Sequence, residues 1–315
     1  MILFSAKISQ RHQDRLKETY PDLEIIFSEG TEDTYKYIEE AEVLVTYGSE
    51  LEEKMIERAG KLEWMMVLSA GVDKMPFQAV KDKGIPVTNA RGIHKIQMSE
   101  YAISMLLQVY RGAKQLAESE RKHHWDRSVK MREMTGRTLL IAGTGAIGQE
   151  VARLAKAFQM KTIGISRSGR SKEYFDETYE NSKLDDLLPE VDAVVSVLPS
   201  TEETRGFYKE KHFQMLPDHA VFLNMGRGDA VKEEVLLEAV RKKEIDHVIL
   251  DVFEEEPLPE NHPFWEEERV TITPHLAGMS PNYTTRALEV FEKNLKVYLD
   301  GKNDYINLVD MDRGY

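Results

Sequence analysis

Short apolar runs alternate with segments of helical periodicity along almost the whole chain. Runs with the composition of β-strands lie in the first part at 2–4, 24–27, 43–46, 64–68 and 86–88. Further runs lie at 138–142, 162–165, 193–198, 220–224, 247–251 and 270–273. Several, such as TLLIA and AVVSVL, are almost continuously apolar, which is typical of strands buried on both faces of a parallel sheet. This alternation predicts an α/β fold with doubly wound parallel sheets.

Two longer segments have helical periodicity. One runs from 97 to 118, where apolar residues recur three or four positions apart. The other begins near Pro281 and ends at Gly301, a residue suited to the position just after a helix C-terminus. We place the crossings between two domains at these two helices.

Composition narrows the classes of protein to consider. The chain has 315 residues, enough for two domains, and 41% of them are hydrophobic, so a sizeable core can form. It has no cysteine, which excludes disulfides and thiolate metal sites and fits a reducing compartment. The net charge of −13 disfavours nucleic acid and anionic lipid as partners. No apolar run approaches the ~20 residues that span a bilayer, and the apolar start MILFSA is too short for a signal peptide. We therefore expect a cytoplasmic protein.

The segment TLLIAGTGAIGQEVARLAKAF predicts a dinucleotide-binding loop. An apolar strand ends at Ala142, the glycines of a G-x-G-x-x-G pattern follow at Gly143, Gly145 and Gly148, and a helix begins. The first glycine permits a tight turn, the second lets the backbone approach a pyrophosphate, and the third lets helix and strand pack closely. The amides at the helix start favour the phosphate charge. A glycine turn without a ligand is the alternative, but strand, turn and helix occur in the order that the dinucleotide site requires.

The next strand bears on which dinucleotide binds. An NAD site places an acid about 20 residues after the glycine loop, where it binds the ribose hydroxyls. Here the sequence continues with Ser166, Arg167, Ser168 and Arg170, and no carboxylate occurs before Glu173. Arginine and serine would bind a 2′-phosphate that a carboxylate would repel. The sequence therefore favours NADPH over NADH, the alternative being that these arginines are solvated.

Charged residues follow three other strands in this half of the chain. Arg227 stands between two glycines, where the backbone can turn sharply and leave a guanidinium free to bind a carboxylate through two hydrogen bonds. The acids at 254–256 precede Pro257, and His275 follows a strand and a proline. Ligands of open α/β sheets bind beyond the carboxyl ends of strands, where all three segments lie. Taken singly, each could be a solvated loop. The adjacent acids are not spaced for one coordination sphere, so we expect no metal site.

Together these segments resemble the D-isomer-specific 2-hydroxyacid dehydrogenases. The resemblance rests on the glycine loop and on the motifs NMGRGDAVKEEVLLEAV, LDVFEEEPLP and VTITPHLAG. It continues in LSAGVDKM and GIPVTNARG of the first part, and so covers most of the chain in the right order. It implies two Rossmann-like domains with the active site in the cleft between them. The substrate-binding domain would comprise 1–98 and 283–315, and the dinucleotide-binding domain 99–282.

The resemblance also implies roles for individual residues. Arg227 would hold the substrate carboxylate and carbonyl, His275 would be the acid/base, and Glu256, directly before the proline, would be the histidine's partner. The backbone amides of Ser69, Ala70 and Gly71 would receive the substrate carboxylate. Tyr47, which follows the strand at 43–46, either lines the substrate's side-chain pocket or packs in the core. The expected cofactor-binding residues are Gly143, Gly145, Ala146, Ile147, Gly148, Ser166, Arg167, Ser168, Arg170, Pro199, Thr204, Met225, Asp251 and Gly278.

The hypothesis is an oxidoreductase that reversibly reduces a small 2-oxo acid, such as glyoxylate or hydroxypyruvate, to the D-2-hydroxy acid. NADPH is the favoured coenzyme, with NADH possible. The family implies a homodimer formed through the nucleotide domains. Two alternatives stay open: a dinucleotide-sensing binding protein without turnover, and a family member that acts on phosphite or another acid.

Overall fold

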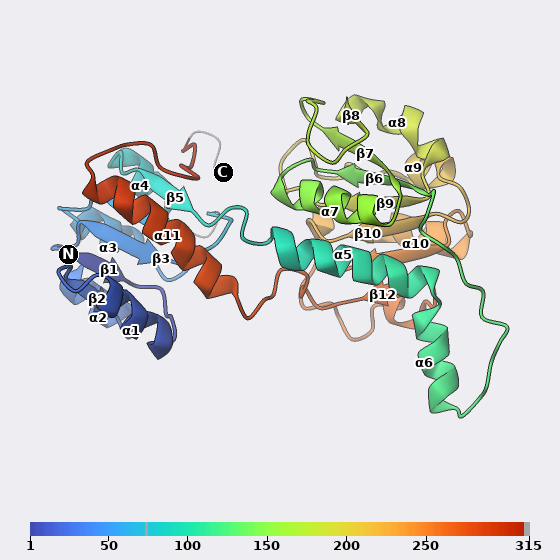
Figure 1. Ribbon diagram of the computed structural model, residues 1–315, viewed down its shortest axis with the longest axis horizontal. Helices are drawn as coiled ribbons and strands as arrows, with labels where there is room; N and C mark the ends of the chain where they lie inside the picture. Colours follow the sequence, from blue (N-terminus) through green and yellow to red (C-terminus); the bar gives the residue numbers. More distant parts are fainter. Residues whose placement is uncertain (73–74, 312–315) are drawn as a thin grey trace. The chain divides into compact units, whose positions relative to one another are not determined.

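A computed structural model describes residues 1–72 and 75–311. The chain divides into two compact units (Figure 1). One comprises Met1–Ile93 with Ser280–Tyr315, and the other comprises His94–Met279. Among the described residues, no helix combines the length and the hydrophobicity that crossing a bilayer requires.

The first unit is a parallel sheet with helices on both faces. Its strand order is β2-β1-β3-β4-β5. One face packs against α1 and the C-terminal helix α11, where the rings of Trp64 and Phe291 stack at 5.7 Å. The other face packs against α3 and α4. The elements are β1 (Ile2–Phe4), α1 (Gln10–Thr19), β2 (Ile25–Phe27), α2 (Thr31–Tyr37), β3 (Val43–Thr46), α3 (Glu53–Arg58), β4 (Trp64–Val67), α4 (Phe77–Asp82), β5 (Val87–Asn89) and α11 (Tyr283–Leu299).

The second unit is a larger parallel sheet of order β12-β11-β10-β9-β6-β7-β8. The order reverses between β6 and β9, the point at which doubly wound sheets bind ligands. α5 and α7 pack on one face, and α9 and α10 on the other. The elements are α5 (Lys95–Tyr110), α6 (Ala113–Arg121), β6 (Thr138–Ala142), α7 (Ala146–Ala157), β7 (Lys161–Ser166), β8 (Glu177–Glu180), η1 (Asn181–Lys183), α8 (Leu184–Leu187), η2 (Leu188–Glu190), β9 (Ala193–Ser196), α9 (Glu210–Met215), β10 (Val221–Asn224), η3 (Gly228–Ala230), α10 (Glu233–Arg241), β11 (His247–Leu250), η4 (Pro263–Glu266) and β12 (Val270–Ile272).

The two sheets confirm the α/β class and show where sequence periodicity failed. The prediction missed β8, because its sequence ETYE lacks an apolar run and the strand lies at the sheet edge. The single helix expected at 97–118 is wrong. Gly112 has φ +62° and ends the helical path between α5 and α6, and a Cβ there would lie 2.5 Å from Val129 Cγ1. α6 therefore projects away from the sheet of this unit (Figure 1).

His247 on β11 makes the stability of the second unit depend on pH. Its Nε2 lies 2.8 Å from Thr271 Oγ1. Burial, followed by the charges of Lys114, Arg132 and Arg269, lowers the pKa of His247 from 6.5 to about 3. Between these values the unfolded chain binds a proton that the folded chain does not, so stability falls as the pH falls below about 6.5.

We predict that His247→Gln, which keeps a hydrogen-bonding side chain, removes this dependence. Lowering the pH from 7.5 to 5 should cost the wild type about 2 kcal/mol more than the variant, since 1.5 pH units correspond to about that free energy. Urea unfolding at both pH values measures the difference. The exposed His124→Gln is the control, and equal losses in wild type and His247→Gln would contradict the prediction.

Candidate active site

The turn between β6 and α7 has the shape that a dinucleotide needs. Gly143 has φ +105°, and a Cβ on Gly148 would lie 2.0 Å from the Gly143 carbonyl oxygen. By contrast, a Cβ on Gly145 would meet nothing within 4 Å, which leaves space beside the backbone. Gly145 precedes Ala146 and Ile147, and no side chain caps this helix. Open space beside uncapped amides fits a pyrophosphate.

The loop after β7 is held by the strand that the sequence did not reveal. Gly169 has φ +58°, and a Cβ there would lie 2.8 Å from the backbone nitrogen of Glu180. Thr178 Oγ1 donates to the Gly169 carbonyl at 3.0 Å. Ser166 is the last residue of β7, and the loop with Arg167, Ser168 and Arg170 that follows it is therefore fixed against β8, with the Arg170 side chain exposed.

In the loops after β9 and β10, polar groups form hydrogen bonds with neighbouring backbone groups of the protein. Thr204 Oγ1 accepts from Thr201 N at 2.8 Å and donates to the Pro199 carbonyl at 2.5 Å, so its hydroxyl closes the turn. Met225 is 2% exposed, and its N–H donates to the Ser196 carbonyl at 3.1 Å. These residues shape the edge of the sheet, and their contact with a cofactor stays a prediction.

The glycines that flank Arg227 are required by close packing. A Cβ on Gly226 would lie 2.6 Å from the Leu198 carbonyl oxygen, after β9, and one on Gly228 would lie 2.0 Å from the backbone of Phe253, after β11. Neither glycine lies in the left-handed region, so close approach of the two neighbouring chain segments, and not a sharp turn, excludes side chains there.

The Arg227 side chain is exposed, and its Nη1 donates to the Gly226 carbonyl at 2.8 Å. Within residues 1–72 and 75–311, no carboxylate forms an ion pair with this guanidinium. Its charge and its remaining N–H donors are thus available to an anionic ligand.

The loop that carries His275 is organised by the buried carboxylate of Asp251, which is 1% exposed. Asp251 Oδ1 accepts from Thr273 Oγ1 at 2.6 Å and from Leu276 N at 2.8 Å. Its Oδ2 accepts from Ala277 N at 2.9 Å. His275 lies between these donors with φ +53°, a conformation that a non-glycine residue keeps only when its surroundings impose it. Asp251, expected beside the cofactor, is therefore also the anchor of this loop.

Glu256 contacts His275 directly. The imidazole Nδ1 lies 2.8 Å from Glu256 Oε2, and Glu256 Oε1 accepts from Phe253 N at 3.0 Å. The two side chains are 53% and 36% exposed, so both reach solvent. The carboxylate orients the ring through Nδ1 and leaves Nε2 for a ligand, the arrangement of a general acid/base with its partner.

The three consecutive glutamates after β11 have different environments. Glu256 contacts His275, whereas burial and the neighbouring Glu233 raise the pKa of Glu254. Glu255 is exposed. Across the described part of the chain, no three acidic or histidine side chains are arranged to hold a metal ion.

Two residues at the start of α5 contact the His275 loop, and the sequence did not identify them. Gln97 Nε2 donates to the Gly278 carbonyl at 3.2 Å. A Cβ on Gly278 would lie 3.3 Å from His94 Cδ2, so the imidazole packs against this glycine. Burial, then the Arg227 charge, lowers the pKa of His94, which favours a neutral ring beside the guanidinium. The sequence signal was weak, because His94 is one of nine histidines and belongs to no recognised motif.

The expected substrate-binding residues of the first unit lie after β3 and β4. Ser69 Oγ donates to the Gly71 carbonyl at 2.7 Å, and Asn89 Nδ2 donates to the Ala70 carbonyl at 2.8 Å, so the loop is held by its carbonyl groups. Tyr47 packs against the core of the unit, which leaves both of its suggested roles open. Residues 73–74 of the motif LSAGVDKM lie outside the described residues.

Comparison with known proteins places the chain in a family. Residues 103–277 match the model of the D-isomer specific 2-hydroxyacid dehydrogenase NAD-binding domain. A glyoxylate reductase of Aeropyrum pernix is 31% identical over 259 residues, which are 79% of this chain and 76% of that protein. A D-3-phosphoglycerate dehydrogenase of Methanocaldococcus jannaschii is 30% identical over 302 residues, which are 92% of this chain and only 56% of that protein.

A solved structure extends the likeness to three dimensions. The NADPH-dependent glyoxylate/hydroxypyruvate reductase of Sinorhizobium meliloti, in complex with NADP and sulfate, is 28% identical. It superposes with a TM-score of 0.83 over 100% of this chain and 99% of that chain. The family match covers the glycine turn, Arg227, Glu256 and His275. The chain therefore belongs to the D-isomer specific 2-hydroxyacid dehydrogenases, NAD(P)-dependent oxidoreductases that act on CH–OH groups.

Proposed function

We propose that this protein reversibly reduces a small 2-oxo acid to the D-2-hydroxy acid with NADPH. The observation that carries the proposal is the 2.8 Å contact between His275 and Glu256, in the same unit as the exposed guanidinium of Arg227. Glyoxylate and hydroxypyruvate are the first candidate substrates, because related reductases are named for them. The cytoplasm is the proposed compartment, since a chain without cysteine suits a reducing environment.

The mechanism assigns each side chain a task. Arg227 binds the substrate carboxylate through paired hydrogen bonds and polarises the keto oxygen. His275 gives its Nε2 proton to that oxygen, while Glu256 keeps the ring oriented through Nδ1. NADPH, when bound at the turn between β6 and α7, supplies the hydride. The backbone amides of Ser69–Gly71 are proposed to bind the same carboxylate.

The test is NADPH oxidation by the wild type and His275→Asn with glyoxylate, hydroxypyruvate and pyruvate. Loss of the proton donor should lower kcat about 10²–10⁴-fold, because positioned acid–base groups contribute rate factors of that size. Coenzyme affinity, measured by fluorescence titration, should not change. Near-normal turnover by His275→Asn would refute the mechanism. A wild type that binds NADPH tightly but reduces none of the acids would support the dinucleotide-sensing alternative.

The preference for NADPH is proposed from the loop after β7. Arg167 and Arg170 add positive charge there, and β8 fixes the loop through Gly169. A phosphate on the adenosine ribose would gain charge-assisted hydrogen bonds that NADH cannot form.

We predict that Arg170→Ala raises the KM for NADPH about tenfold or more and leaves the KM for NADH within twofold, since a hydrogen bond to a charged group contributes about 1.5–3 kcal/mol. Initial rates with both coenzymes measure the two constants. Lys172→Ala, an exposed charge on the same loop, should change neither. Equal efficiency of the wild type with NADH and NADPH would contradict the preference.

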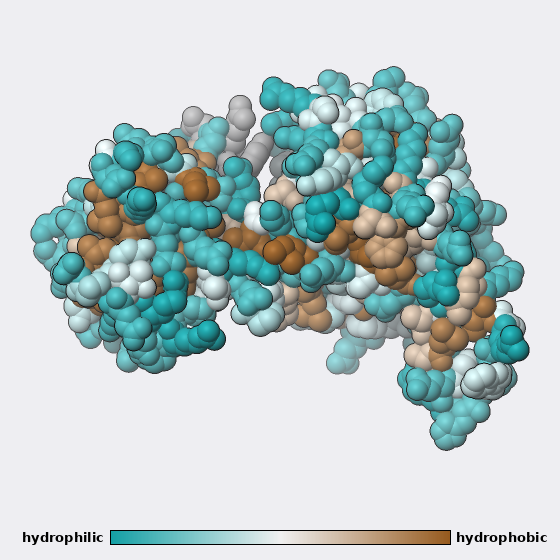
Figure 2. All heavy atoms as spheres, in the orientation of Figure 1, coloured by the Kyte–Doolittle hydropathy of each residue, from teal (hydrophilic) through white to brown (hydrophobic). Residues whose placement is uncertain are grey.

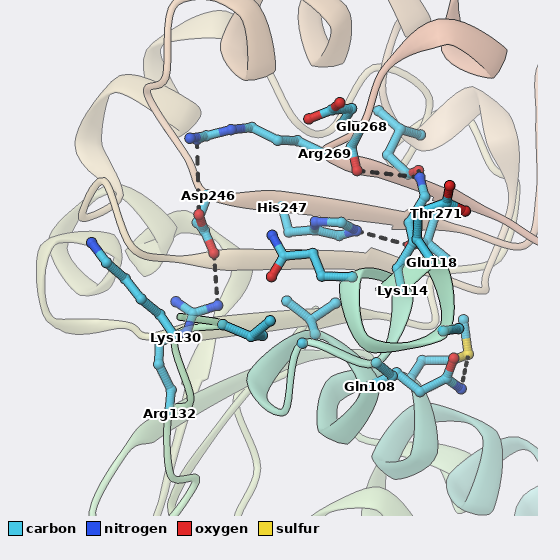
Figure 3. Close-up of a pocket in the computed structure, with 18 of the residues that line it drawn as sticks. Gln108, Lys114, Glu118, Lys130, Arg132, Asp246, His247, Glu268, Arg269 and Thr271 are labelled. Carbon is cyan, nitrogen blue, oxygen red and sulfur yellow. Dashed lines mark hydrogen bonds and ion pairs between the residues drawn. The ribbon is translucent and has the colours of Figure 1, made fainter. Parts of the chain in front are cut away.

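A homodimer is proposed through the hollow beside α6. This hollow encloses about 1890 Å³ between α5, α6, residues 126–132 and the β11–β12 edge of the sheet. Figure 3 shows polar side chains lining it, with the Asp246 carboxylate between Arg132 and Arg269. Hydrophobic side chains are also exposed there: Met131 at 45% and Trp265 at 50%, with Trp125 nearby in sequence at 89%. Figure 2 shows hydrophobic residues gathered over α6. A second copy would cover these apolar groups.

We predict that Met131→Asp weakens self-association by tenfold or more, because an unpaired carboxylate would be buried in the interface. Sedimentation velocity at micromolar concentrations measures the change. Met215→Asp, at a hydrophobic residue 37% exposed on α9, is the matched control and should leave the dimer intact. A wild type that sediments as a monomer would overturn the dimer proposal.

A further inference from the structure

We propose that Glu233, the first residue of α10, is a positioning residue that holds Glu256 against His275. This inference rests on the proposed function. It adds a residue that contacts neither His275 nor a ligand. Glu233 Oε1 accepts from the backbone N–H of Glu254 at 3.0 Å, two residues before Glu256. The Glu233 side chain is only 17% exposed, and its hydrogen bond to Glu254 lies at the protein surface.

The second oxygen of Glu233 holds the far end of the same loop. His262 Nε2 lies 3.2 Å from Glu233 Oε2, and the His262 side chain is also 17% exposed. His262 Nδ1 accepts from Phe264 N at 3.3 Å, so the opposite edge of the ring is held by the backbone. Phe264 is itself in the hydrophobic core at 1% exposure. One carboxylate thus joins the beginning and the end of the segment that contains Glu256.

The held segment leads directly to the acid/base pair. Phe253 N donates to Glu256 Oε1 at 3.0 Å, which turns Oε2 toward His275 Nδ1 at 2.8 Å. The backbone of Phe253 also packs against Gly228, beside Arg227, where a Cβ would come within 2.0 Å. A shift of this backbone would therefore misplace Glu256 and disturb the turn that carries Arg227. A displacement of about 1 Å can reduce a rate by about a hundredfold.

A simpler role for Glu233 would be a favourable charge at the start of α10. Carboxylates in the first turn of a helix contribute about 0.3–1 kcal/mol through the helix dipole. Glu234 also lies in that first turn, but its side chain is exposed and forms none of the contacts of Glu233 in the part of the chain that is described. The two neighbours therefore separate a dipole effect from a positioning effect.

The experiment is a double-mutant cycle measured by NADPH oxidation with the best 2-oxo acid. We expect Glu233→Ala to lower kcat on the order of ten- to a hundredfold, with coenzyme Kd within twofold of the wild type. Glu234→Ala should leave kcat within twofold. In a Glu256→Ala background, adding Glu233→Ala should change kcat less than twofold, because the residue it positions is already absent. Glu233→Gln keeps an oxygen for Glu254 N, so its kcat should lie between those of Glu233→Ala and the wild type.

Each outcome decides the proposal. It is overturned if Glu233→Ala keeps kcat within twofold, if Glu234→Ala loses as much, or if the costs of Glu233→Ala and Glu256→Ala multiply in the double variant. If Glu233→Ala fails to unfold cooperatively, the same cycle is run with Glu233→Gln. The same criteria then apply, with a smaller expected decrease in kcat. If the wild type reduces none of the 2-oxo acids, the proposed function is wrong. If the wild type is active and Glu233→Ala has the same kcat, only the inference about Glu233 is wrong.

Discussion

The buried carboxylate of Asp251 is the constraint on which the rest of the site depends. It accepts three hydrogen bonds from the loop of His275, two of them from backbone amides. These bonds hold His275 in a left-handed backbone conformation that the chain would otherwise avoid. Because a buried charge needs such partners, the loop and the carboxylate stabilise each other. Removing either would leave buried polar groups without partners.

Parallel strands bring this loop close to its neighbours. The ends of β9, β10 and β11 meet at one edge of the sheet, where glycines at 226 and 228 allow backbone segments to touch. The turn of Arg227 therefore packs on the segment that leads to Glu256. Small residues at the close contacts make the positions of the charged groups interdependent, which is why a residue as remote as Glu233 can be proposed to affect the acid/base pair.

The electrostatic arrangement leaves the charge of Arg227 available to a ligand. Arg227 is exposed, and burial, followed by the charge of this guanidinium, lowers the pKa of His94. A neutral His94 imidazole adds no positive charge near Arg227. It also carries no negative charge that would neutralise the guanidinium. An anionic substrate would thus meet a guanidinium that no carboxylate of the described residues has paired.

Apolar runs and local motifs in the sequence determined the strands, the glycine turn and the parallel α/β class, because these depend on residues close together along the chain. β1, β3 and β6 begin and end where the sequence predicts. Arg227, Glu256 and His275 could be singled out by motif and resemblance. The polar edge strand β8, the break at Gly112 and the contacts of Asp251, His94 and Glu233 could not. Tertiary structure alone decided these, because each depends on atoms that only folding brings into contact, such as Val129 against Gly112 or Glu233 against Glu254.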